Sequence, residues 1–208
     1  MQFDVLIVGG GPAGLSAALI LGRCHRKALL CDEGHQRNLS SQAIHDLLGR
    51  EGRSPSDFLG EALAELSRYK LIEVRGTRVT GIVPTGEAFN FVCADGTHGT
   101  ASKVLLATGL VDELPVLAGL EPLYGVPVHH CLYCDGFEYA GKPVAAYGKD
   151  DKGAELAVMM KHWMSDVVAR SDGTESARKQ PGSSKDSKFR CDLSQSGPLK
   201  ARTGSLPK

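Results

Sequence analysis

The sequence has no surplus of either charge and contains few aromatic residues. Its 24 basic and 24 acidic residues give a formal net charge of zero, and aromatic residues make up 6% of the chain, with a single tryptophan. Proteins that bind nucleic acids usually present a basic face, often together with aromatic side chains that stack on bases. The composition therefore argues against nucleic acid as a partner.

Long hydrophobic runs are also lacking. The first residues, Met1-Gln2-Phe3-Asp4, place no basic segment before the short apolar run that follows, so they do not resemble a secretory signal peptide. No run approaches the roughly 20 apolar residues that span a bilayer. We therefore expect a cytoplasmic protein with no membrane partner.

Cysteines are present, but they do not form the framework of a disulfide-rich protein. A reducing compartment makes structural disulfides unusual, and of six cysteines only Cys131 and Cys134 have an informative spacing. We expect the other four to be ordinary buried or incidental thiols: Cys24, Cys31, Cys93 and Cys191.

The first thirty residues have the pattern of a nucleotide-binding unit. Residues 3–8 form a continuous apolar run, which predicts a strand buried on both faces of a parallel sheet. Gly9-Gly10-Gly11-Pro12-Ala13-Gly14 follows and fits G-x-G-x-x-G, helical periodicity covers about residues 12–23, and residues 27–31 predict a second strand. Strand, glycine turn, helix and strand in this order are typical of dinucleotide binding.

Each part of the turn has a separate predicted role. Gly9 permits the tight bend, Gly11 lets the backbone approach a pyrophosphate, and Gly14 lets the helix pack against the strand. Pro12 and Ala13 begin the helix, whose free N–H groups then face the phosphates. These five residues are the predicted pyrophosphate site.

Acidic residues stand at the end of the second strand. Asp32 can accept hydrogen bonds from ribose hydroxyls, and Glu33 is the alternative by count. Arg37 lies in the polar loop that follows, where it either touches the nucleotide or is only solvated. We expect His45, farther along, to be a surface residue.

The middle of the chain predicts further elements. Ser54 is placed to cap a helix that extends to about residue 69. Residues 71–104 change toward a period of two, with turn residues at 84–86 and 95–96, and predict a small antiparallel meander. A buried strand follows over about residues 103–109, and the segment 114–127, rich in proline and glycine, predicts a crossing between domains.

The pair Cys131 and Cys134 predicts redox chemistry. A thiolate is the attacking group in thiol–disulfide exchange, and a C-x-x-C arrangement near a cationic histidine favours it. Asp135 follows directly and can carry the proton that the exchange must move. Two alternatives stay open: zinc bound by His129 or His130 with both cysteines, and two inert thiols.

Three motifs together resemble low-molecular-weight thioredoxin reductase and its flavoprotein relatives: VGGGPAGLSAA at 8–18, LLATG at 105–109 and CLYCDG at 131–136. The resemblance covers about residues 3–170. It implies an FAD-dependent pyridine nucleotide-disulfide oxidoreductase, in which Thr108 and Gly109 also contact FAD. It further implies that Cys134 faces the flavin, that Cys131 exchanges with a thioredoxin-like disulfide, and that Asp135 is the acid/base. Since relatives are commonly dimers, a homodimer is one candidate assembly.

The chain also departs from that family. A second glycine motif for NADPH should follow residues 142–148, but Asp150 stands at its middle position and Arg170 is one arginine where the family has a basic cluster. Both features argue against NADPH use. The pattern is also similar to the dithiol oxidases that close disulfides in small molecules such as gliotoxin and holomycin, which pass electrons to oxygen. That function, and a catalytically impaired FAD-binding remnant, are the two alternatives.

Residues 171–208 are rich in serine and show no periodicity, so we expect a disordered or unrelated tail in a C-terminally truncated family member. The predicted division is an FAD-binding domain over 1–110, a partial second domain over 111–170, and the tail. The predicted fold class is α/β: an FAD/NAD(P)-binding, Rossmann-like, three-layer domain with a small antiparallel meander, plus an incomplete second nucleotide-type domain.

Overall fold

The computed structural model describes residues 1–149, 151–170 and 190–191. The chain divides into two compact units. The first contains Met1–Ile44 and Leu48–Glu113, and the second contains His45–Leu47 and the chain from Leu114 onward. The predicted division after residue 110 stays a prediction. Within the described residues no helix is long and apolar enough to cross a membrane.

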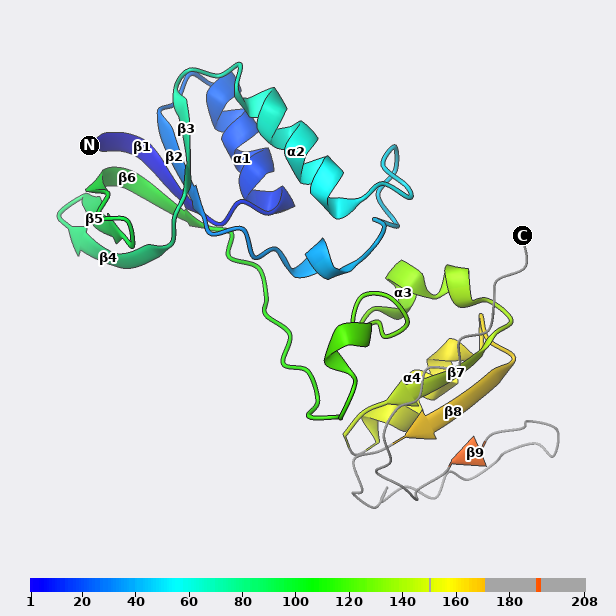
Figure 1. Ribbon diagram of the computed structural model, residues 1–208. Coiled ribbons are helices and arrows are strands. Elements are labelled where there is room, and N and C mark those ends of the chain that lie inside the picture. Colours follow the sequence, from blue (N-terminus) through cyan, green and yellow to red (C-terminus); the bar gives the residue numbers. More distant parts are fainter. Residues whose placement is uncertain (150, 171–189, 192–208) are drawn as a thin grey trace. The chain divides into compact units, whose positions relative to one another are not determined.

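The first unit is built on one six-stranded sheet with the order β3-β2-β1-β6-β5-β4 (Figure 1). Strands β3, β2, β1 and β6 are parallel to one another, whereas β5 runs antiparallel to both β6 and β4. The elements in chain order are β1 Gln2–Val8, α1 Pro12–Arg23, β2 Ala28–Asp32, the 3-10 turn Arg37–Ser40, α2 Pro55–Leu66, β3 Ile72–Gly76, β4 Val79–Thr85, β5 Ala88–Cys93 and β6 His98–Leu106.

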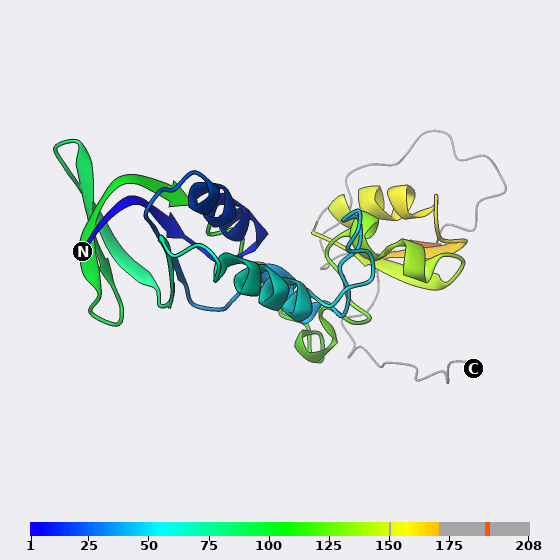
Figure 2. The same cartoon turned by 90° about the horizontal axis from the view of Figure 1, so that it is seen from above.

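The apolar strands β1 and β2 are buried on both faces, as a continuous hydrophobic run predicts. Helices α1 and α2 lie side by side on one face, where the core contains Ile7, Leu15, Ala18, Ala28, Leu30, Leu59 and Leu66 (Figures 1 and 2). The other face is covered by the β4–β5 ribbon, and its core contains Phe3, Leu6, Leu29, Cys31, Phe91, Cys93 and Ala101. Helices, sheet and ribbon make the three layers, and the predicted α/β class is confirmed.

Strand β6 joins the ribbon to the parallel sheet. Its first residues pair with β5, up to Ala101, and its residues from Thr100 onward pair with β1, as far as the pair Val8 and Leu106. The predicted meander and the strand that follows it are therefore parts of one continuous ladder. The predicted start of the meander at residue 71 is wrong, because β3 pairs in parallel with β2 and leaves only β4, β5 and β6 antiparallel.

The predicted cap of α2 is confirmed. The side chain of Ser54 accepts a hydrogen bond from the backbone N–H of Asp57, and a proline occupies the first turn. The cap satisfies an N–H group that the helix itself cannot pair.

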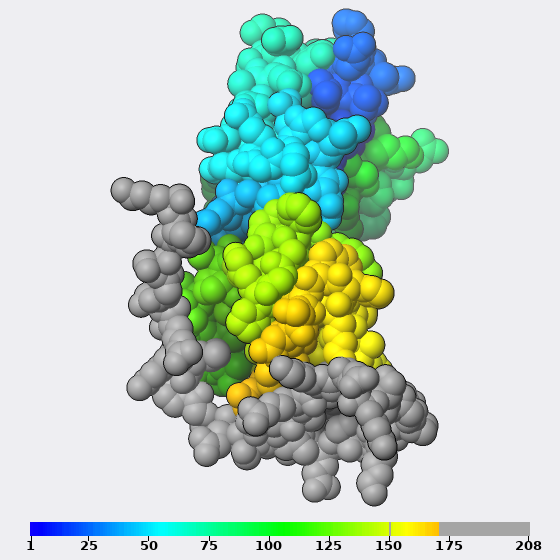
Figure 3. Space-filling view, turned by 90° about the vertical axis from the view of Figure 1, so that its right-hand side faces the viewer, coloured from blue at the N-terminus to red at the C-terminus, as the bar shows by residue number. Residues whose placement is uncertain are grey.

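The second unit contains a three-stranded parallel sheet, β7-β8-β9. Its core consists of Ala146, Ala157, Met164, Val167 and Ala169, and side chains of Leu132 and Tyr139 pack against it. The segment around α3 thus rests on the β7-α4-β8 layer, as the space-filling view also shows (Figure 3). The elements are the 3-10 turn Glu121–Leu123, α3 Leu132–Asp135, the 3-10 turn Phe137–Tyr139, β7 Pro143–Tyr147, α4 Lys152–Met160, β8 Asp166–Arg170 and β9 Arg190–Cys191.

Strand β9 is the part of the predicted tail that the structure describes. It pairs in parallel with β8 through Val168 and Ala169, although the sequence showed no strand periodicity there. The rest of 171–208 lies outside the described residues, and so does Asp150.

Candidate functional sites

The glycine turn between β1 and α1 is tightly packed at two of its three motif positions. Gly9 has a φ of +107°, and a Cβ there would overlap the carbonyl oxygen of Ala107 and lie 3.2 Å from the Cα of Thr108. A Cβ on Gly14 would overlap the carbonyl oxygen of Gly9. These two glycines are needed for the bend and for the approach of the helix to the strand.

The middle motif position differs, because space is free beside it. The heavy atom nearest to a Cβ built on Gly11 is Cγ of Gln36, at 3.9 Å. Gly11 is the N-cap of α1, no side chain caps this end, and the first turn has Pro12 but no acidic residue. A backbone with open space and free N–H groups at a helix N-terminus fits a pyrophosphate.

Asp32 is held against the same turn. Its Oδ1 accepts the N–H of Gly10 at 2.9 Å, and its Oδ2 accepts the N–H of Gly34 at 3.1 Å and the amide of Gln36. The carboxylate is thus oriented while Oδ1 keeps a free lone pair. Glu33 instead lies 3.8 Å from Arg78, so the structure brings Asp32, and not Glu33, to the predicted pyrophosphate site. The sequence analysis did not identify Gly10 or Gln36 as partners of Asp32.

The remaining predicted cofactor residues have different surroundings. Thr108 follows β6 and lies beside the glycine turn, and Gly109 has a φ of +66°. Arg37 forms a two-pronged ion pair with Asp112, with distances of 2.7 and 2.6 Å. An arginine–carboxylate pair of this geometry fixes the side chain, so the role of Arg37 toward a nucleotide stays a prediction.

Cys131 and Cys134 are joined by a disulfide, with their Cα atoms 5.3 Å apart. Cys131 is the N-cap of the short helix α3, and its sulfur accepts the backbone N–H of Cys134 at 3.2 Å. Both cysteines are half-buried. This combination suits a bond that another thiol must reach.

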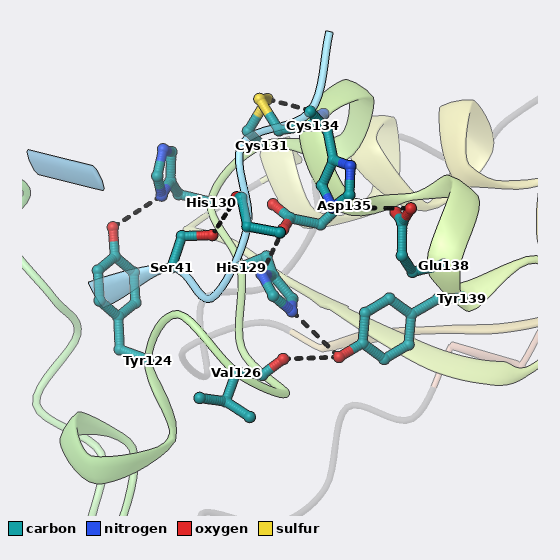
Figure 4. A network of polar contacts seen from close by, with 12 residues as sticks. Ser41, Tyr124, Val126, His129, His130, Cys131, Cys134, Asp135, Glu138 and Tyr139 are labelled. Atoms are coloured by element: carbon teal, nitrogen blue, oxygen red, sulfur yellow. Dashed lines mark hydrogen bonds and ion pairs between the residues drawn. A yellow bond between two sulfur atoms is a disulfide. The ribbon is translucent and has the colours of Figure 1, made fainter. Parts of the chain in front are cut away.

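A polar network lies directly beneath the disulfide (Figure 4). His129 bridges two groups: its Nδ1 is 3.1 Å from Oδ1 of Asp135, and its Nε2 is 3.1 Å from the hydroxyl of Tyr139. The hydroxyl of Tyr139 donates to the carbonyl of Val126 at 2.6 Å. Burial, followed by the charges of Asp135 and Glu138, raises the pKa of Tyr139 above its ordinary value, so the phenol keeps its proton.

Part of this network was not predicted from the sequence. Asp135 was expected beside the dithiol, and His129 was weighed as a zinc ligand or as one of the histidines near the pair, but not as a partner of Asp135. Tyr139 comes from the next turn of chain and gave no sequence signal. Among the described residues, no group of three or more His, Cys, Asp or Glu side chains is arranged to hold a metal ion. His130 makes a separate contact, with its Nδ1 2.8 Å from the hydroxyl of Tyr124.

The second glycine turn, between β7 and α4, repeats the packing of the first. A Cβ on Gly148 would lie 2.5 Å from the backbone nitrogen of Gly153, and one on Gly153 would lie 2.9 Å from the carbonyl oxygen of Arg170. These two glycines bring strand and helix together. The middle position, Asp150, lies outside the described residues, so its predicted effect on NADPH stays a prediction.

The remaining described cysteines differ from the disulfide pair. Cys24 is exposed, whereas Cys31 and Cys93 are buried with their sulfurs 3.8 Å apart. Burial, followed by the neighbouring Cys93, raises the pKa of Cys31 to about 12, and burial also raises the pKa of Cys93. Thiols that keep their protons are poor nucleophiles.

The sequence and the fold can be compared with known proteins. Residues 3–174 match the family model of the pyridine nucleotide-disulphide oxidoreductases. A protein of Arthroderma benhamiae described as "Probable thioredoxin reductase" is 36% identical over 180 residues, which are 84% of this chain and 45% of that protein. The thioredoxin reductase sirT of Leptosphaeria maculans is 38% identical over 147 residues, which are 69% of this chain and 45% of the relative.

A solved structure supports the same relationship. The oxidoreductase from Agrobacterium tumefaciens superposes with a TM-score of 0.76 at 36% identity, over 82% of this chain and 57% of that one. The chain thus spans about half the length of the relatives that it matches. On the family match and the shared fold, the chain belongs to the pyridine nucleotide-disulphide oxidoreductase family.

Proposed function

We propose that this chain is the FAD-binding and dithiol-bearing part of a flavin-dependent disulfide oxidoreductase of the thioredoxin reductase type. The observation that carries the proposal is the half-buried Cys131–Cys134 disulfide with Asp135 directly beside it. A disulfide that only stabilises the fold needs no carboxylate held by a histidine. One that exchanges with other thiols needs a group that moves protons.

The first unit offers a site that fits FAD. The open backbone at Gly11 and the uncapped start of α1 would receive the pyrophosphate, and Asp32 would accept hydrogen bonds from a ribose. Thr108 and Gly109, next to the glycine turn, would line the same site. When bound, the flavin would supply a second two-electron carrier that can exchange electrons with the dithiol.

In the second unit, we assign Cys134 to the flavin side and Cys131 to the exchange with substrate. Asp135 is the group that holds or moves the proton. The relatives described as thioredoxin reductases favour a thioredoxin-like disulfide as the substrate class. For the pyridine nucleotide, we keep the prediction that Asp150 weakens NADPH binding.

Flavin binding and its dependence on the dithiol test this function. The purified chain is incubated with FAD, freed of excess flavin, and its visible spectrum is recorded under anaerobic conditions before and after adding dithiothreitol. We expect bound flavin that bleaches in the wild-type chain and bleaches much more slowly in Cys134→Ser. NADPH is added in a parallel cuvette, where we expect little bleaching.

Two results would contradict the proposal. One is a folded chain that retains no flavin in excess FAD. The other is a bound flavin whose reduction by dithiothreitol is the same in Cys134→Ser as in the wild type. Gly11→Ala is the matched control for the cofactor site, since its side chain has room in the fold and should lower only flavin retention.

A further inference from the structure

The protons of the network beneath the disulfide can be assigned from its hydrogen bonds. The hydroxyl of Tyr139 has one proton and two polar neighbours. The carbonyl of Val126, at 2.6 Å, can only accept, so the phenol donates its proton there. The phenol oxygen must then accept from His129 at 3.1 Å. Consequently Nε2 of His129 carries a proton, because a bare nitrogen would face another lone pair.

The second ring nitrogen of His129, Nδ1, faces Asp135. Nδ1 of His129 lies 3.1 Å from Oδ1 of Asp135. The two atoms lie at ion-pair distance. When the contact holds one proton, that proton is either on an imidazolium beside a carboxylate or on a carboxylic acid beside a neutral imidazole. Both forms leave the pair with no net charge, and both hold one transferable proton.

We propose that His129 is a positioning residue that keeps one transferable proton in its contact with Asp135, with Tyr139 fixing the imidazole so that its Nδ1 faces the carboxylate. The pair is well placed for this task. Its side chains are only 18% and 17% exposed, and Asp135 directly follows Cys134 in the chain. This inference rests on the proposed function, since it names how the same dithiol exchanges protons with its substrate.

The charged groups around the pair come from the neighbouring 3-10 turn and from the residue before β7. Glu138 is 3.7 Å from His45 and so has a basic partner of its own. The ammonium group of Lys142 lies over the ring of Tyr139, 5.1 Å from its centre. Neither group lies between His129 and Asp135, so the proton of the pair is held by these two residues.

The exchange step balances with this single proton. The thiolate of Cys131 attacks a substrate disulfide R–S–S–R′, which forms a Cys131–S–R bond and expels R′–S⁻. That thiolate takes the proton of the pair. Cys134 then attacks the sulfur of Cys131, and its own proton returns to Asp135. R–S⁻ leaves and takes from solvent the proton that Cys131 had released. The enzyme dithiol loses two electrons, and the substrate disulfide becomes two thiols.

A test follows from the leaving group. An aliphatic thiolate is a basic leaving group that needs a proton, whereas an aromatic nitrothiolate leaves without one. The chain is reduced with a phosphine, without flavin, and single-turnover exchange is measured with bis(hydroxyethyl) disulfide and with dithiobis(nitrobenzoate). Because general acid–base catalysis contributes about 10²–10⁴-fold, we expect His129→Gln to slow the aliphatic reaction at least about tenfold. The aromatic reaction should change by less than about twofold.

His130→Gln is the matched control and should leave both reactions at the wild-type rate. Free imidazole should restore the aliphatic reaction of His129→Gly. Equal slowing of both disulfides, or of neither, would overturn the assignment. The proton position is tested separately in the wild-type chain by ¹⁵N spectra of the histidine rings, where a His129 Nε2 without a proton would also overturn it. None of these measurements uses flavin. A failure to bind FAD would therefore refute the proposed function, while the role of His129 could still be judged from the exchange rates.

Discussion

The packing of the first glycine turn allows a quantitative prediction for Gly14→Ala. The added Cβ would overlap the carbonyl oxygen of Gly9, and it would lie 3.4 Å from Cγ2 of Ile7. Overpacking usually costs about 1–3 kcal/mol. Here the clashing atom belongs to the backbone of the same turn and cannot rotate away, so we expect a cost near about 3 kcal/mol. For a unit of roughly 100 residues each kcal/mol lowers Tm by about 4–8 °C, which gives a loss of more than about 10 °C.

The chain contains separate probes for its two units. Trapping of the buried thiols Cys31 and Cys93 reports unfolding of the first unit, and the fluorescence of Trp163 reports the second. We expect Gly14→Ala to shift only the thiol-trapping transition. Gly11→Ala is the control, because its Cβ would lie no closer than 3.9 Å to any heavy atom and should cost less than about 1 kcal/mol. A Gly14→Ala chain as stable as Gly11→Ala would refute the packing argument.

Three further predictions concern the first unit. Asp32→Ala removes a carboxylate that would bind a ribose, and because hydrogen bonds to charged groups contribute about 1.5–3 kcal/mol, flavin affinity in a fluorescence titration should fall at least about tenfold. In the folded chain the pKa of Cys31 is about 12, whereas in the unfolded chain it is near its ordinary value of 9.0. Unfolding therefore releases a proton at pH values between these two, and the free energy of unfolding should fall as pH rises above about 9, by up to about 1.4 kcal/mol per pH unit. In urea melts over this pH range, the free energy of unfolding of Cys31→Ala should fall less steeply with pH than that of the wild type. An equally steep fall would contradict this prediction. Ser54→Ala removes the cap of α2 and should cost about 1 kcal/mol in the same melts, whereas no loss would mean that the bond to Asp57 is not formed in solution.

The elements that depend on local pattern could be predicted from the sequence. The helix Pro12–Arg23 and the strands around it follow from one apolar run and one glycine turn, and both appear as expected. The cap at Ser54 follows from a single serine before a proline. In each case the physical cause lies within a few residues, so the local sequence is enough to predict the element.

Features that depend on contacts distant in sequence could not be predicted in the same way. Strand β3 has the alternation of a meander strand, but its register places Ile72 beside Ala28 in the parallel sheet. Only the tertiary pairing decides whether this strand joins the antiparallel meander or the parallel sheet. Likewise, His129 and Tyr139 are ten residues apart and lie on either side of the short helix α3 instead of within one regular element, so no spacing rule predicts that their side chains meet.

A comparison of the two glycine turns shows which glycines of the motif are needed for packing and which one indicates a ligand. Gly9 and Gly14 in the first turn, and Gly148 and Gly153 in the second, all occupy positions where a Cβ would meet backbone atoms. These four glycines are explained by close backbone packing around the turn, whether or not a nucleotide binds. The open space beside Gly11 has no such packing reason, which makes the middle position the one that indicates a ligand. A first and third glycine therefore predict a βαβ unit, and only the middle glycine adds evidence for a bound pyrophosphate.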